Sequence, residues 1–125
     1  MRHMNMAVMA ASILSAAAIA GCAASGPTFK ESSEPSKSSI RAAEEVGAAK
    51  VPSASFYLQL AKEKLENARA LAAEGKKEEA ASMLKRAEAD AELAITLSHE
   101  QAERTEAAKA VERARQLRID NQLPN

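Results

Sequence analysis

The sequence predicts an all-α fold, an elongated antiparallel helical hairpin within a coiled-coil-like three-helix arrangement. Alanine carries much of an apolar fraction of 46%, beside 27% charged and only 2% aromatic residues. Alanine has the highest helix propensity but buries little area, so this composition indicates long helices that pack closely. In addition, two stretches repeat apolar residues at spacings of three and four, and Gly75 separates them.

A short first helix is expected from Ser38 or Ser39 to about Ala49, because a serine at that position can cap it. Its apolar face would consist of Ile40, Ala43, Val46 and Gly47. The helix should end before Pro52, since a residue that precedes proline is pushed out of the helical region.

A second helix over 53–73 and a third over about 77–118 should form the hairpin, with Gly75 as the helix cap between them. Glu78 and Glu79 favour the start of the third helix through the helix dipole. The expected seam contains Leu58, Ala61, Leu65, Ala68, Ala80, Leu84, Ala87 and Ala91.

The third helix is about twice as long as the second, so roughly half of it should overhang the hairpin. The overhang carries an apolar stripe, a candidate partner surface, made of Ala107, Val111, Ala114 and Leu117. The first short helix could cover part of this stripe, and a protein partner or a second copy of the chain could cover the rest.

The front of the chain has an uncharged run, Met6 to Ala20, about as long as the apolar core of a signal peptide. It leads into Ile19-Ala20-Gly21-Cys22, which resembles the lipobox of bacterial lipoproteins. That resemblance implies a signal peptide over 1–21, cleavage between Gly21 and Cys22, and a diacylglyceryl group and an N-acyl chain such as palmitate on Cys22. The alternative is a free structural cysteine, but an odd cysteine in a secreted protein calls for another explanation.

Ala23 follows the cysteine, where enterobacterial lipoproteins of the inner membrane tend to have Asp. The resemblance therefore favours an outer-membrane anchor facing the periplasm over an inner-membrane one. The Ser- and Pro-rich stretch up to residue 37 predicts a flexible tether. The expected organisation is a signal over 1–21, lipidated Cys22 and a tether over 22–37, a helical domain over 38–119, and a disordered tail over 120–125.

The segment from Ser39 to about Leu117 resembles the DUF4398 family, a domain of unknown function in envelope lipoproteins and exported proteins. The residues that carry the resemblance are Gly47-Ala48-Ala49 followed by Pro52, Leu60-Ala61, Leu65-x-x-Ala68, Gly75, and Ala87 to Ala94 around Asp90. The family implies a helical fold and placement in the envelope, but no activity. Some members carry an OmpA-like peptidoglycan-binding domain, which this sequence lacks. A weaker likeness to half a tetratricopeptide unit is set aside, because such arrays need about three repeats.

Catalysis is not expected. His99 is the only histidine after Cys22, so neither a transition-metal site nor a serine triad can be assembled, and we expect no cofactor and no metal. With 17 basic and 17 acidic residues, the chain has no field that would attract nucleic acid. Carboxylates alternate with cations, as in the pairs Glu100–Arg104 and Glu112–Arg115, which is typical of solvated helix faces.

Two functions remain open from the sequence. The first is a structural or adaptor lipoprotein that presents its apolar stripe to an envelope protein or to itself. The second is a module that binds peptidoglycan or anionic lipid through the basic end of the long helix. The candidate anion contacts are Arg104, Lys109, Arg113, Arg115 and Arg118. Cations near a helix C-terminus are also expected from the helix dipole alone.

Overall fold

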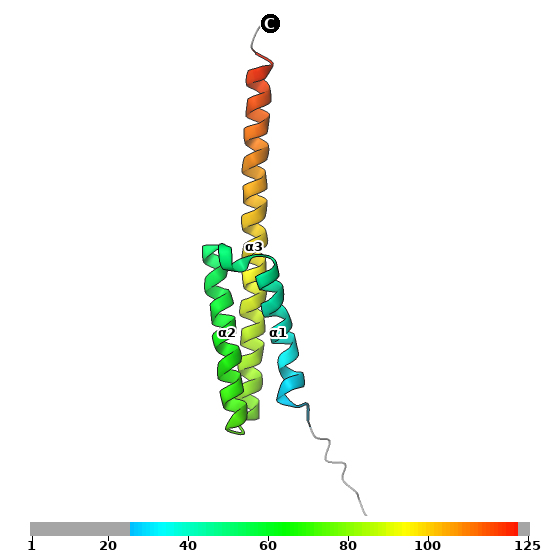
Figure 1. Ribbon diagram of the computed structural model, residues 1–125, viewed down its shortest axis with the longest axis vertical. Helices are drawn as coiled ribbons and strands as arrows, with labels where there is room; N and C mark the ends of the chain where they lie inside the picture. Colours follow the sequence, from blue (N-terminus) through cyan, green and yellow to red (C-terminus); the bar gives the residue numbers. More distant parts are fainter. Residues whose placement is uncertain (1–25, 123–125) are drawn as a thin grey trace, which may run out of the picture.

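The computed structural model describes residues 26–122, and the segment expected to be a signal peptide with a lipobox and a lipidated Cys22 lies outside them. The described chain forms α1 (Phe29–Glu45), a 3₁₀ turn η1 (Ala48–Lys50), α2 (Pro52–Ala73) and α3 (Lys77–Asp120). Within these residues there is no strand, and the all-α class predicted from the sequence is confirmed. The three α-helices lie side by side as a bundle, and α3 continues alone beyond it (Figure 1).

The hairpin of α2 and α3 is the most extensive contact of the fold, as the apolar spacing predicted. Ala61, Ala68, Ala87 and Ala91 are completely buried between or beside the helices, and Leu58 and Leu84 are nearly so. Alanine side chains allow the helix axes to approach closely, so many small contacts replace a few large ones. Ala80 is also buried, whereas Leu65 is only half-buried at the edge of the core.

The turn between α2 and α3 depends on Gly75, which has a left-handed φ of 80°. The N–H of Lys76 donates to the carbonyl of Leu71 (2.9 Å), and the N–H of Gly75 donates to that of Ala72 (3.1 Å). These two bonds make a Schellman motif, which satisfies carbonyls that the end of a helix leaves unpaired. The chain therefore reverses within three residues, and α3 begins at Lys77 as expected.

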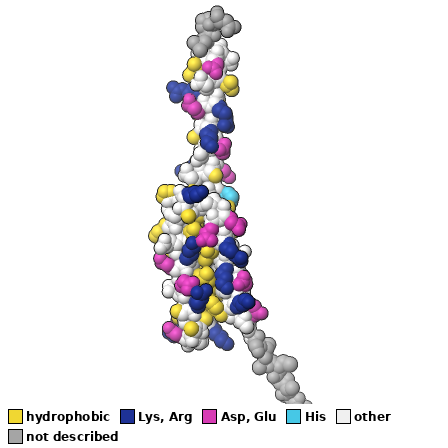
Figure 2. Space-filling view, in the orientation of Figure 1, with side chains coloured by type: hydrophobic (Ala, Val, Ile, Leu, Met, Phe, Trp, Pro, Cys, Tyr) yellow, Lys and Arg dark blue, Asp and Glu magenta, His cyan; other side chains and the backbone are white. Residues whose placement is uncertain are grey.

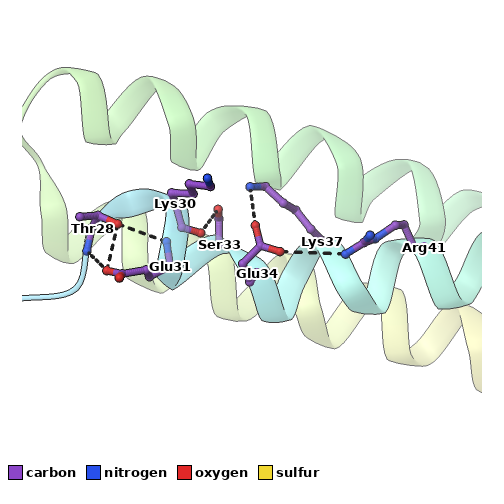
Figure 3. A network of polar contacts seen from close by, with 7 residues as sticks. All are labelled: Thr28, Lys30, Glu31, Ser33, Glu34, Lys37 and Arg41. Atoms are coloured by element: carbon purple, nitrogen blue, oxygen red, sulfur yellow. Dashed lines mark hydrogen bonds and ion pairs between the residues drawn. The ribbon is translucent and has the colours of Figure 1, made fainter.

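The first helix is longer than predicted and begins at Phe29, not at Ser38 or Ser39. Thr28 and Glu31 form a capping box: the Thr28 backbone N–H donates to the Glu31 carboxylate (2.8 Å), and the Glu31 N–H donates to the Thr28 hydroxyl (3.4 Å) (Figure 3). This reciprocal pair satisfies two donors at the helix start. The predicted flexible tether over 22–37 is consequently wrong for residues 29–37, which are helical.

Pro35 was expected to break regular structure, but it lies inside α1. A proline there removes the N–H that would bond to the Glu31 carbonyl. Packing on α3 compensates, since Ser33 and Ser36 on either side are buried while Pro35 itself is exposed. The Ser36 hydroxyl donates to the Leu84 carbonyl across the interface (2.9 Å).

At its other end α1 stops at Glu45, four residues short of the predicted Ala49. Gly47 adopts a left-handed φ of 81° and turns the chain into η1, so it does not belong to the apolar face of α1. Val46 is likewise exposed, whereas Ile40 and Ala43 are in the core. Pro52 then occupies the first turn of α2, where its missing N–H costs nothing.

Charged contacts tie the three helices together around this core. The Lys62 ammonium on α2 lies 2.5 Å from the Glu44 carboxylate on α1. Lys64 on α2 pairs with Asp90 on α3, and both side chains are largely shielded from solvent. Basic and acidic groups are interspersed over the visible face of the bundle (Figure 2).

Candidate docking surface on the long helix

The bundle covers only the first half of α3. Ser98 is the last buried residue, and every residue from 99 to 120 is exposed. We call this exposed stretch, 99–120, the free half of α3; it is about 33 Å long at 1.5 Å per residue. Figure 1 shows it as the rod that leaves the bundle.

Side-chain pairs at helical spacing stabilise the free half. Arg104 donates to Glu100 (2.6 Å), Lys109 pairs with Glu106 (2.9 Å), and the Gln116 amide donates to Asp120 (3.0 Å). Each such pair contributes a few tenths of a kcal/mol. The packed half of α3 also supplies the helix nucleus, the step that makes isolated helices of this length marginal.

The overhang stripe, Ala107, Val111, Ala114 and Leu117, lies in the free half and is open to solvent. Val111 is 69% exposed and Leu117 is 62% exposed, the two highest values among the exposed large apolar side chains of the described residues. Figure 2 shows hydrophobic side chains between the charged ones on the free half. The stripe is thus an apolar helix face without a partner among the described residues.

The stripe points away from the bundle. Ala107 follows Ser98 by nine residues, which is two and a half turns of an α-helix, so the two side chains leave opposite sides of α3. The first helix therefore does not cover it, contrary to one arrangement that the sequence left open. Instead α1 packs beside the buried half of α3, where Ser36 meets Leu84.

The five expected anion-contact residues divide into two groups. Arg104 and Lys109 are engaged in the ion pairs described above. Arg113, Arg115 and Arg118 are exposed, and none has an ion-pair partner within residues 26–122. The expected pair Glu112–Arg115 is consequently not formed, and toward the tip of α3 lies a group of guanidinium groups with no ion-pair partner in the described part of the chain.

The remaining titratable side chains have no arrangement that suggests chemistry. His99 is exposed at the start of the free half. In the part of the chain that the structure describes, no three His, Cys, Asp or Glu side chains lie close enough to hold a metal ion. The Thr28 backbone N–H, and then its hydroxyl, hydrogen-bond to the Glu31 carboxylate and lower its pKa. This shift belongs to a helix cap and does not mark an active site.

An apolar groove lies at the foot of the bundle, the end where α1 and α3 begin and α2 ends. Pro27, Phe29, Ala72, Ala80 and Leu84 form much of its lining. Sequence reasoning missed this groove because it assigned residues 26–29 to a tether. The sequence signal for the start of α1 is Thr28-x-x-Glu31, a capping-box pattern, and the structure then places that start beside residues of the α2–α3 end such as Ala72.

The anchor residues predicted from the sequence, Ile19, Ala20, Gly21 and Cys22, lie outside the described residues. From residue 26 to residue 122, none of the helices combines the length and apolar character needed to cross a bilayer.

Comparison with known proteins gives one match. Residues 33–114 match the family described as "Domain of unknown function (DUF4398)". No curated protein and no solved structure matches the chain. The matched region runs from the second turn of α1, through all of α2, to Ala114 within the overhang stripe, so it includes the bundle and most of the free half. The chain belongs to the DUF4398 family.

Proposed function

We propose that this protein is a lipid-anchored, non-catalytic structural or adaptor module of the cell envelope, which acts by docking through the overhang stripe. The observation that carries the proposal is the free half of α3, which displays Val111 and Leu117 to solvent on a helix that the bundle holds in place. Apolar patches of this kind mark interaction sites when they are contiguous and rimmed by polar groups.

The lipobox supports the anchor. Cys22 precedes the cap residue Thr28 by six positions, and an extended chain spans at most about 3.6 Å per residue. The foot of the bundle would therefore lie within about 20 Å of the membrane, a shorter distance than a tether up to residue 37 would allow. A thioether-linked diacylglycerol plus an N-acyl chain gives stable attachment, whereas one acyl chain gives only reversible binding. Ala23 favours the outer membrane, with the protein facing the periplasm.

A second candidate function is binding of peptidoglycan or anionic lipid, and a specific observation favours it. Arg113, Arg115 and Arg118 have no ion-pair partner among the described residues and are free to meet phosphate or carboxylate groups. They lie at the opposite end of the molecule from residue 26 (Figure 1), which favours a ligand distant from the anchor. Such binding should weaken steeply as salt rises, whereas docking of the stripe should not.

Photo-crosslinking in cells tests the adaptor role. A photo-reactive residue at Val111 should give a discrete adduct, and the same residue at exposed Arg69 on α2 should not. A Val111 probe that gives no adduct beyond the Arg69 control would contradict docking through the stripe. The anchor is tested separately by metabolic labelling with a palmitate analogue, which should label the wild type and not Cys22→Ser.

A further inference from the structure

We propose that the partner on the overhang stripe is a second copy of this chain, paired antiparallel along the free half of α3. The inference rests on the proposed function, since it identifies the occupant of the same stripe. Three features of the described residues support it: the composition of the stripe, the charge distribution along the free half, and the side of α3 from which a partner must approach.

The composition of the stripe matches a packing that this chain already uses. The α2–α3 interface is an antiparallel contact between alanines with a few larger knobs such as Leu58 and Leu84. The stripe likewise combines Ala107 and Ala114 with Val111 and Leu117. Two such faces can approach closely and interdigitate without a void, because the small residues of one accept the larger residues of the other.

The charge distribution favours the antiparallel direction. The first part of the free half, residues 99–108, carries Glu100, Glu103 and Glu106 against Arg104, a net charge of −2 with neutral histidine. The second part, 109–120, has a net charge of +2. Its charged residues are Lys109, Arg113, Arg115 and Arg118 against Glu112 and Asp120.

An antiparallel copy places the acidic part of each helix beside the basic part of the other. A parallel copy instead places like charges together, which is unfavourable. The two helix dipoles also attract each other only in the antiparallel arrangement, because the positive end of one helix then lies beside the negative end of the other. Arg113, Arg115 and Arg118, which have no ion-pair partner among the described residues of one copy, thereby gain carboxylates in their neighbourhood.

Access is unobstructed in this arrangement. The stripe lies on the side of α3 opposite to Ser98 and the bundle, so α1 and α2 do not block a partner. When the two free halves overlap fully, the bundle of each copy lies beyond the tip of the other. The result is a rod of about 100 Å with a bundle at each end. Two anchors in one membrane then require the rod to lie along the membrane surface.

Disulfide trapping distinguishes this arrangement from its rivals. Single variants Ala107→Cys, Val111→Cys and Ala114→Cys are made in the full chain and oxidised in intact membranes. We place Ala107 of each copy opposite Ala114 of the other, a register whose two-fold axis lies between residues 110 and 111, one residue beyond the midpoint of 99–120. This register brings Val111 close to its own copy. Ala107 and Ala114 are each about 10 Å from their own copies along the axis, and a disulfide needs Cα atoms within about 7 Å.

We expect Val111→Cys to form about tenfold more dimer than either flanking variant alone, because only its thiols come within disulfide reach. Co-expression of Ala107→Cys with Ala114→Cys should restore the dimer. Equal dimer from all three single variants indicates parallel pairing, and no dimer from any of them indicates a different occupant; either result overturns the proposal.

The wild type is the control for disulfides through Cys22. The photo-crosslink at Val111 remains the separate test of docking, because it captures a different partner even when self-pairing is absent.

Discussion

The Ser36 hydroxyl of α1 donates a buried hydrogen bond to the backbone carbonyl of Leu84 on α3, at 2.9 Å. Ser36 is 1% exposed, so two helix backbones meet there without a bulky side chain between them. The contact lies next to Pro35, where α1 lacks one of its own backbone bonds. This polar link joins α1 to the buried half of α3, beside the apolar contacts of Ile40 and Ala43 in the core.

Replacing Ser36 with alanine should weaken the bundle modestly. The lost hydrogen bond is worth about 1 kcal/mol of unfolding free energy, since the Leu84 carbonyl keeps its place in the backbone ladder of α3. Urea denaturation followed by circular dichroism measures the change, with Ser38→Ala on the exposed face as the control. Equal stability of the two variants would show that the buried bond contributes nothing.

Ala87→Asp should separate the hairpin. Ala87 is completely buried between helices, and an aspartate there buries a charge with no partner in the seam. The expected loss is about 3 kcal/mol or more of unfolding free energy, enough to unfold a small domain substantially. Ala89→Asp, two residues further on the exposed side of α3, should change the thermal midpoint little. A hairpin that tolerates aspartate at 87 would refute the close packing described above.

The capping box should make the start of α1 sensitive to acid. The pKa of Glu31 is lowered in the folded protein by hydrogen bonds from Thr28, so the carboxylate stabilises the helix above the unfolded pKa of 4.5. That contribution disappears as the pH falls through the lower, folded pKa, because protonation removes the acceptor. The protection factors of the amides in the first turn of α1, which are corrected for the intrinsic exchange rate at each pH, should fall as the pH is lowered.

Glu31→Gln is the matched control for this prediction, because the glutamine side chain can still accept from Thr28 but does not titrate. In that variant the acid-dependent opening of the first turn should be absent. Persistence of the same pH dependence in Glu31→Gln would assign it to another group.

Lys64 and Asp90 should be energetically coupled across α2 and α3. Their ion pair is shielded more than the other ion pairs of the described chain, with side-chain exposures of 26% and 17%. A double-mutant cycle with Lys64→Met and Asp90→Asn should give a coupling of about 1 kcal/mol, the upper end for pairs that solvent still reaches. The exposed pair Arg69–Glu66 is the comparison and should give a smaller value. Equal couplings would mean that partial burial adds nothing to the Lys64–Asp90 pair.

Local sequence patterns are enough to predict the helical class, the hairpin of α2 and α3 and the turn at Gly75. These features follow from local spacing and from the one residue type that adopts a positive φ without strain. The length of α3 beyond its partner was also predictable, since no glycine or proline interrupts the helix before Pro124. The resemblance of Ile19-Ala20-Gly21-Cys22 to a lipobox is equally local, because it consists of four consecutive residues, and lipidation of Cys22 stays a prediction.

The start of α1 and the surface that it covers depend on packing against distant helices, which local sequence patterns do not reveal. Ser33, Pro35 and Ser36 suggest a loop when considered by local propensity, and they become helical because both serines are buried in the bundle, with Ser36 bonded to Leu84 on α3. The overhang stripe can be identified as an uncovered face of α3 only when the position of the bundle, on the opposite side of the helix, is known. Helix formation depends largely on residues that are close in the sequence. Which face of a helix is buried depends instead on helices that are distant in the sequence and pack against it.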